Sequence, residues 1–298
     1  MFGRDNIKVY FASAENIQNQ AGIRYGGVHY ALFSAYPLIA KKMKLKCASF
    51  MNAAVIEREE IPAVTAKNFK HVIMDSGIYT LAYGGMQNKL NDFELWYDYY
   101  THMMDMVKTL PDNITVAEFD CQDALGIQTA WDMRNEMRKW YPDRDVINIW
   151  HPYSDGIEGL YKLIEYTNYL GLPVRGFLSK GDNLTRILME VQRRKPGLRV
   201  HLFGGTSRSA LTQGRQLAYS ADSTAWNEGT RYGTISHMKK RHINHAVKLV
   251  DDNRLAKATE GLLDLTKATP ATIFSVKAAA ISAEINKRAY AVWAGDQE

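Results

Sequence analysis

Short apolar runs alternate with amphipathic stretches along the whole chain. Eight of these runs are rich in β-branched or other apolar residues and end in small or polar ones, which is typical of buried parallel strands. They cover residues 8–14, 45–50, 71–76, 114–120, 146–151, 174–179, 200–204 and 217–222. Helical periodicity marks the segments between them, for example residues 93–110 and 156–171. The alternation predicts an α/β fold, the (β/α)8 or TIM barrel, with a doubly wound open sheet as the alternative.

The length of the chain suits one barrel with an extension. A (β/α)8 domain commonly needs about 250 residues, and the chain has 298. We expect a catalytic barrel over residues 1–236 and a helical C-terminal extension over residues 237–298, packed on the barrel. The insertion at residues 79–91 carries Gly84 and Gly85 and is expected to be an active-site loop.

Composition and the first residues favour a cytoplasmic protein. Apolar residues make up 46% and charged residues 23% of the chain, which is ordinary for a globular fold. We find no apolar run of the roughly 18 residues that a membrane helix requires, and the chain does not start like a secretory signal. Cys47 and Cys121 do not form a Cys-x-x-Cys pair, so we expect neither a disulfide framework nor a zinc or redox motif there.

Polar side chains lie where the expected strands end, and in (β/α)8 enzymes this is the end of the barrel that carries the active site. Asp75, Asp120 and Asp222 terminate the third, fourth and eighth strands, while His151 and Ser179 terminate the fifth and sixth. A single aspartate at a strand end more often caps a helix or forms a turn. Three carboxylates in one mouth would raise one another's pKa, which indicates acid, base or nucleophile chemistry.

Carboxylates in this number suit chemistry at a glycosidic carbon. One can attack or stabilise C1′ while a second gives or takes a proton at the leaving group. A third can hold the N1 and N2 hydrogens of guanine, because both are donors and a carboxylate is a paired acceptor. An unrelated barrel glycosidase that acts on a sugar is an alternative with the same carboxylate pair.

Two clusters of positive charge are candidates for nucleic-acid contact in a chain with a formal net charge of +5. They are Arg193, Arg194 and Lys195, and Lys239, Lys240 and Arg241. Such clusters attract a polyanion, but solvated helix faces that bind nothing carry them as well. Charge alone therefore leaves nucleic-acid binding open.

Four motifs follow one another along the expected barrel. They are MDSGIYT at residues 74–80, AEFDCQD at 117–123, VHLFGG at 200–205 and YSADSTAW at 219–226. In this order they resemble the Asp-Ser-Gly motif, the base-recognition strand, the glycine-ended seventh strand and the nucleophile strand of the tRNA-guanine transglycosylase superfamily. The Asp-Ser-Thr-x-Trp ending of the last motif resembles the bacterial and phage branch, which inserts 7-deazaguanines into DNA.

The resemblance implies a role for each matching residue. Asp222 would be the nucleophile that displaces guanine and forms a covalent link to C1′, and Asp75 would be the general acid/base. Asp120 would recognise the departing guanine and the incoming 7-deazaguanine. The base site would be lined by Ser76, Gly77, Ser179, Gly204 and Gly205.

The chain departs from the family at the metal site. The tRNA enzymes hold structural zinc with a Cys-x-Cys-x-x-Cys run and a later histidine, and here no cysteine follows Asp222. His237, His242 and His245 are weak candidates for a metal site, the last two on one helix face. The chemistry itself requires no cofactor, and structural zinc stays an open question.

Loss of the zinc segment favours DNA over tRNA as the polymer, with a 7-deazaguanine base as the second substrate. The target base must leave its stack to reach the mouth, and the aromatic candidates to hold it are Tyr79, Phe119, Trp150 and Trp226. The alternatives are a tRNA-guanine transglycosylase and a non-catalytic nucleic-acid-binding subunit. The sequence leaves open whether a homodimer or a helper protein is needed, and the resemblance suits a phage enzyme that protects DNA from restriction.

Overall fold

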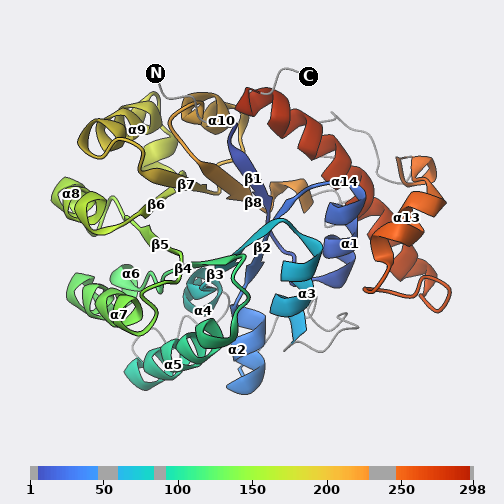
Figure 1. Ribbon diagram of the computed structural model, residues 1–298, viewed down its shortest axis with the longest axis horizontal. Coiled ribbons are helices and arrows are strands. Elements are labelled where there is room, and N and C mark those ends of the chain that lie inside the picture. Colours follow the sequence, from blue (N-terminus) through green and yellow to red (C-terminus); the bar gives the residue numbers. More distant parts are fainter. Residues whose placement is uncertain (1–5, 46–59, 84–91, 228–245, 296–298) are drawn as a thin grey trace.

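The computed structural model describes residues 6–45, 60–83, 92–227 and 246–295, and it shows a closed barrel of eight parallel strands (Figure 1). Each strand pairs with the next along the chain, and β1 pairs with β8 to close the ring. The strands are β1 (Lys8–Phe11), β2 (Tyr30–Ser34), β3 (His71–Asp75), β4 (Ile114–Ala117), β5 (Val146–Ile149), β6 (Tyr169–Pro173), β7 (Arg199–Phe203) and β8 (Ser220–Ser223). The expected (β/α)8 class is confirmed, and the open-sheet alternative is wrong.

Helices form a ring outside the strands (Figure 1). They are α1 (Ile17–Tyr25), α2 (Tyr36–Lys42), α3 (Ile61–Asn68), α4 (Ile78–Tyr83), α5 (Phe93–Thr109), α6 (Gln122–Leu125), α7 (Ile127–Trp140), α8 (Gly156–Tyr166), α9 (Asn183–Arg194), α10 (Arg208–Gly214), α13 (Asp252–Thr259) and α14 (Pro270–Ala294). The described residues also include the short 3-10 helices η4 (Gly176–Ser179), η5 (Ala225–Asn227) and η6 (Val247–Leu249). Within the described ranges, no helix has the length and apolar character needed to cross a membrane.

The second strand lies earlier in the chain than the apolar pattern predicted. β2 covers Tyr30–Ser34, whereas Leu45 is not in a strand and residues 46–50 lie outside the described residues. Residues 31–40 are mostly apolar, so the strand and the start of α2 resemble one buried helix in sequence. The break comes before this run, where Gly27 takes a φ of 65° after α1 and turns the chain into the barrel.

The sixth strand was also predicted too late. β6 covers Tyr169–Pro173, and the expected strand at residues 174–179 contains η4 instead. Strands of a closed parallel barrel are covered on both faces, and Tyr169 to Leu172 are buried whereas Arg175 and Gly176 are exposed. The helical periodicity of α8 continues into β6, which hides the boundary in the sequence.

A hydrogen-bond network fills the barrel at the end where the strands begin. Asp145 pairs with Arg199, with 2.5 Å between Oδ1 and Nη2, and accepts from the Thr115 hydroxyl at 2.8 Å. His71 lies 3.3 Å from the same hydroxyl and 2.9 Å from the Tyr10 hydroxyl. This network lies at the end of the barrel opposite the strand-end aspartates.

The C-terminal helix α14 completes the ring of helices between α10 and α1 (Figure 1). Gly22 on α1 allows this close approach, because a Cβ there would lie 2.5 Å from the Ala279 Cβ and 2.6 Å from its carbonyl carbon. Tyr290 of α14 packs on Phe11 of β1, with ring centroids 5.6 Å apart. α14 therefore packs on the barrel, while residues 237–245 of the expected extension lie outside the described residues.

Candidate active site

Three aspartates from different strands share the mouth of the barrel. Asp75 is the last residue of β3, Asp222 lies in β8, and Asp120 follows the end of β4 at Ala117. The negative charges of Asp120 and Asp222 both raise the pKa of Asp75, which requires that the three carboxyl groups lie near one another. The parallel strands thus bring together the carboxylates that the sequence singled out.

Asp75 holds a proton near neutral pH. Burial, and then the charges of Asp120 and Asp222, raise the pKa of Asp75 to about 7. The Gly77 N–H donates to Asp75 Oδ2 at 3.3 Å and opposes this shift without cancelling it. A carboxyl group that titrates near pH 7 can donate a proton in one step and accept one in the next.

The raised pKa of Asp75 predicts a pH-dependent effect of Asp75→Asn on stability. The folded state binds this proton more tightly than the unfolded state, so the wild type loses stability as pH rises from about 4 to about 7. An asparagine side chain does not titrate, so the variant does not lose stability in this way. We expect the variant to gain at least about 1.4 kcal/mol relative to wild type between pH 4 and pH 8, measured by urea unfolding.

Asp145→Asn serves as the control of opposite sign for that measurement. Burial raises the pKa of Asp145, but the hydrogen bonds and charge of Arg199, with the Thr115 hydroxyl, outweigh burial and lower it. This variant should lose stability relative to wild type only as pH rises to about 4, the ordinary pKa of an aspartate, and the difference should stay constant between pH 4 and pH 8. A pH-independent difference between Asp75→Asn and the wild type would show that the Asp75 carboxyl is not perturbed.

Asp120 lies between a hydroxyl and an imidazole. Ser76 Oγ donates to Asp120 Oδ1 at 3.1 Å, and His151 Nε2 lies 3.4 Å from Asp120 Oδ2. His151 Nδ1 lies 3.2 Å from Asp123 Oδ2. Burial lowers the pKa of His151, but hydrogen bonding and charge from the two aspartates outweigh it and raise the pKa to about 9. The raised pKa favours the imidazolium form of His151, which is an ion-pair partner of Asp120 Oδ2.

Asp222 is buried, and one of its oxygens is held by two donors. Its Oδ1 accepts from the Gly204 N–H at 3.2 Å and lies 3.1 Å from His201 Nε2. Within the part of the chain that the structure describes, Oδ2 makes no hydrogen bond. The side chain is thus fixed through one oxygen and keeps the other available for a reaction.

The three glycines of the expected base site differ in the space that surrounds them. A Cβ on Gly77, whose φ is 79°, would lie 2.7 Å from both the Tyr36 backbone nitrogen and the Tyr99 hydroxyl. Gly204, with a φ of 65°, is exposed at the mouth, and a Cβ there would meet only Arg175 Nε at 3.9 Å. A Cβ on Gly205 would lie 2.5 Å from the Leu202 Cβ, so a larger residue does not fit there. Only Gly204 borders open space.

The four aromatic candidates differ in how far they are exposed to solvent. Phe119, Trp150 and Trp226 are buried in the packing around the barrel. Tyr79 is 70% exposed on α4, shortly after Asp75, so of the four it is the one whose ring is exposed to solvent. Tyr153, which follows β5 and is 81% exposed, is a second aromatic group that the sequence analysis did not consider.

Ser179 bonds within its own turn, and the first basic cluster lies away from the aspartates. The Ser179 hydroxyl donates to the Gly176 carbonyl within its own turn at 2.8 Å. Arg193 and Arg194 both pair with Glu190 at the end of α9 that leads to the start of β7. Lys195 donates to the Thr167 carbonyl just before β6 begins. This cluster is therefore at the far end of the barrel from the mouth.

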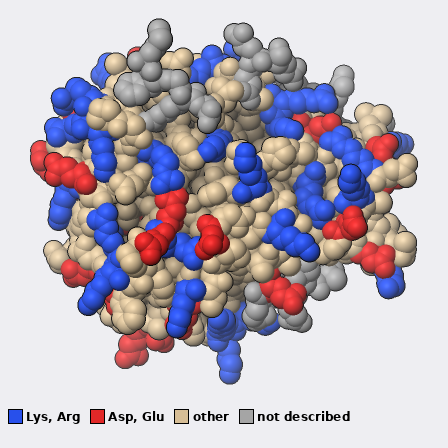
Figure 2. Space-filling model, in the orientation of Figure 1, with Lys and Arg blue, Asp and Glu red and all other residues tan. Residues whose placement is uncertain are grey.

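Other predicted contacts fall outside the described residues. These are Lys239, Lys240 and Arg241, and the histidines His237, His242 and His245. Within the described ranges, no group of three or more histidine, cysteine or acidic side chains is arranged to hold a metal ion. Figure 2 shows lysine and arginine side chains scattered among acidic ones over one face, without a single large basic patch.

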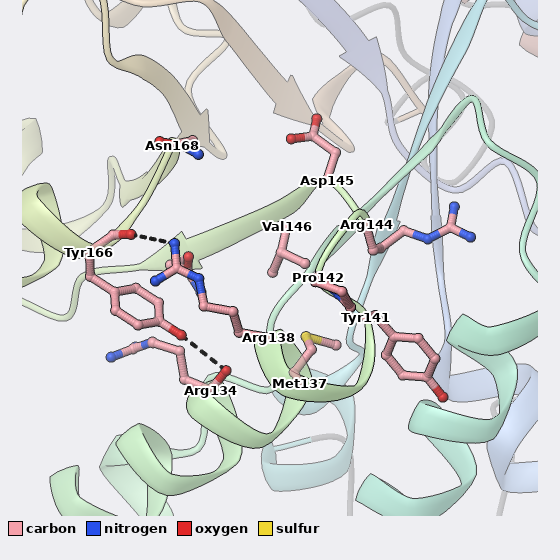
Figure 3. A pocket seen from close by; sticks show the side chains of 11 residues that line it. Arg134, Met137, Arg138, Tyr141, Pro142, Arg144, Asp145, Val146, Tyr166 and Asn168 are labelled. Atoms are coloured by element: carbon pink, nitrogen blue, oxygen red, sulfur yellow. Dashed lines mark hydrogen bonds between the residues drawn. The ribbon is translucent and has the colours of Figure 1, made fainter.

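A small pocket of about 90 Å³ lies where β5 and β6 begin, at the end opposite the aspartates (Figure 3). The charged side chains around it have partners within the protein. Arg138 donates to the Tyr166 carbonyl, Arg144 to the Leu110 and Pro111 carbonyls, and Arg134 and Asp145 form ion pairs with Glu118 and Arg199. Because these charged side chains already have partners, we interpret the pocket as a structural feature of the end of the barrel where the strands begin.

Two residues near the aspartates escaped the sequence analysis. Glu15 follows β1, accepts from the Ser34 N–H at 3.2 Å, and adds a further negative charge that raises the pKa of Asp75. His201 lies inside β7, where strand periodicity indicates only a buried position. Its hydrogen bond to Asp222 depends on the pairing of β7 with β8, which the local sequence does not reveal.

Comparison with known proteins adds no name to this site. No protein-family model matches the chain, and no curated protein matches it.

Proposed function

We propose that the protein is a base-exchange transglycosylase that replaces guanine in DNA with a 7-deazaguanine derivative through a covalent intermediate on Asp222. One observation carries the proposal: three aspartates in one mouth have three different environments. The pKa of Asp75 is raised to about 7, Asp222 has one oxygen without a hydrogen bond among the described residues, and Asp120 accepts from Ser76. These are the properties that an acid/base, a nucleophile and a reader of guanine require.

In the first step, a lone pair of Asp222 Oδ2 forms a bond to C1′ while the C1′–N9 bond breaks. The electron pair of the broken bond leaves with guanine, which takes the proton of Asp75. In the second step, Asp75 takes the proton from N9 of the incoming base, and N9 bonds to C1′ as the C1′–Oδ2 bond breaks. The carboxyl of Asp75 ends as it began, which fits a pKa of about 7.

Asp120 supplies the base specificity in this proposal. Its two oxygens face the N1 and N2 hydrogens of guanine, and a 7-deazaguanine presents the same two donors. Adenine lacks this donor pair and would leave the lone pairs that Asp120 offers to the base unfilled, which disfavours it. Tyr79 provides an exposed ring against which an unstacked base can lie.

DNA is favoured as the polymer because the sequence lacks the cysteine run of the tRNA enzymes. Exposed cations near the mouth are candidates to hold its phosphates. Arg175 follows β6 and lies beside Gly204, Lys180 precedes α9, and Arg208 begins α10. Ion pairs of these three side chains with other described residues are absent, so their charges are available to a polyanion.

We expect Arg175→Ala to weaken DNA binding and to reduce the slope of log K against log salt by about 1, because one phosphate contact is lost. Arg193→Ala is the matched control, since that guanidinium pairs with Glu190 at the far end of the barrel. Fluorescence anisotropy with a labelled oligonucleotide at several salt concentrations measures both. An equal effect of the two substitutions would place the DNA elsewhere on the surface.

The proposed function is tested by exchange and trapping. The protein is incubated with radiolabelled guanine, or with 7-deazaguanine, and with duplex DNA, single-stranded DNA or tRNA. Denaturing electrophoresis detects a covalent protein–nucleic-acid adduct, and nucleoside analysis detects exchange. Exchange in DNA supports the proposal, and exchange only in tRNA replaces it with the tRNA reaction. Binding without exchange in any polymer would favour a non-catalytic subunit.

A further inference from the structure

A chain of hydrogen bonds runs from Asp222 into the interior of the barrel. His201 is completely buried, with Nε2 3.1 Å from Asp222 Oδ1 and Nδ1 2.6 Å from Ser220 Oγ. The Ser220 oxygen lies 2.5 Å from the Tyr169 hydroxyl. The three residues beneath Asp222 come from β6, β7 and β8, so the barrel itself sets their spacing.

The hydrogen-bond partners set the direction of each donor. A carboxylate only accepts, so Nε2 of His201 carries the hydrogen that points to Asp222. In a neutral imidazole Nδ1 is then an acceptor, so the Ser220 hydroxyl donates to it and the Tyr169 hydroxyl donates to Ser220. Burial raises the pKa of Tyr169, which keeps its hydroxyl protonated as the donor that ends the chain.

Aromatic rings enclose the imidazole. The rings of Phe203, Tyr10 and Tyr169 have centroids 4.5, 6.0 and 6.3 Å from that of His201, all in edge-to-face arrangements. Such packing restricts the ring to one orientation. Rotation of the Asp222 carboxylate would break the hydrogen bonds from His201 and Gly204 together.

We propose that His201 is the positioning residue of Asp222: held by Ser220 and Tyr169, it fixes the carboxylate so that Oδ2 faces C1′. This inference rests on the proposed function and deepens it. The hydrogen bond also stabilises the negative charge that returns to Asp222 when the C1′–Oδ2 bond breaks and its electron pair goes back to the carboxylate. Breakdown of the covalent intermediate is therefore the step most sensitive to His201.

The test compares His201→Asn with His201→Gln. The glutamine amide reaches the place of Nε2 and retains a donor for Asp222, whereas the shorter asparagine amide reaches only the place of Nδ1. Adduct breakdown is followed in single turnovers after addition of 7-deazaguanine. We expect a rate about 10- to 100-fold lower for H201N, with H201Q within about 3-fold of wild type and DNA affinity unchanged in both. Equal losses in both variants would overturn the proposal.

Two further measurements cover other outcomes. If H201N does not fold, Ser220→Ala removes the hydroxyl that joins His201 Nδ1 to Tyr169 and should slow adduct breakdown several-fold; an unchanged rate overturns the proposal. If the wild type forms no adduct, the proposed function fails, and nitrogen-15 NMR of the imidazole decides the inference separately. A hydrogen on Nε2 with a bare Nδ1 supports the chain, and a hydrogen on Nδ1 overturns it.

Discussion

Substitution of Asp222 by asparagine is expected to lower the rate of base exchange by at least about 10⁴-fold and to abolish the covalent adduct. An amide oxygen is a far weaker nucleophile than a carboxylate oxygen. It still accepts from the Gly204 N–H, so the mouth should keep its geometry. The measurement is single-turnover guanine exchange, together with electrophoresis of the denatured adduct.

Two controls make this result decisive. Asp222→Ala cannot revert to a carboxylate by deamidation, so its residual rate sets the true background. Asp182→Asn makes the same chemical change at an exposed position before α9 and should keep the wild-type rate. An adduct that persists in both Asp222 variants would move the nucleophile to another residue and remove the basis of the proposed mechanism.

Arg134→Ala is expected to destabilise the fold by about 3–5 kcal/mol, because it leaves the Glu118 carboxylate buried and unpaired. Arg134 and Glu118 form a two-pronged ion pair with distances of 2.6 and 2.7 Å, and both side chains are almost fully buried. Glu118 also accepts from the Asn148 amide and the Ile149 N–H, both at 2.6 Å. The pair thus ties α7, β4 and β5 together just below Asp120.

Urea unfolding measures this loss, with Arg193→Ala as the control. Arg193 makes a similar two-pronged pair with Glu190 but at the surface, where solvent screens the charges, so its removal should leave the midpoint nearly unchanged. Replacement of both Arg134 and Glu118 by leucine should recover part of the stability, because no unpaired charge remains. Equal midpoints for the two arginine variants would contradict the buried pair.

Local patterns were sufficient where a strand begins after a clear helix and carries a charged residue at or next to its end. β3 and β8 are such strands, and they carry Asp75 and Asp222. β2 and β6 failed because Tyr30–Ser34 adjoins the apolar start of α2 and Tyr169–Pro173 continues the periodicity of α8. In both cases the local preference is ambiguous, and burial on both faces of the closed barrel decides the strand.

The sequence by itself determined the barrel class, the strand ends that bear aspartates, and the order of the motifs. Alternating strands and helices leave a local periodicity in the sequence, and that alternation indicates parallel strands. Only the tertiary structure decided how each aspartate differs. The raised pKa of Asp75, the free oxygen of Asp222 and the pairing of Asp120 with His151 arise from burial and from neighbours on other strands. Contacts across strands depend on register and closure, which no single segment of the chain encodes.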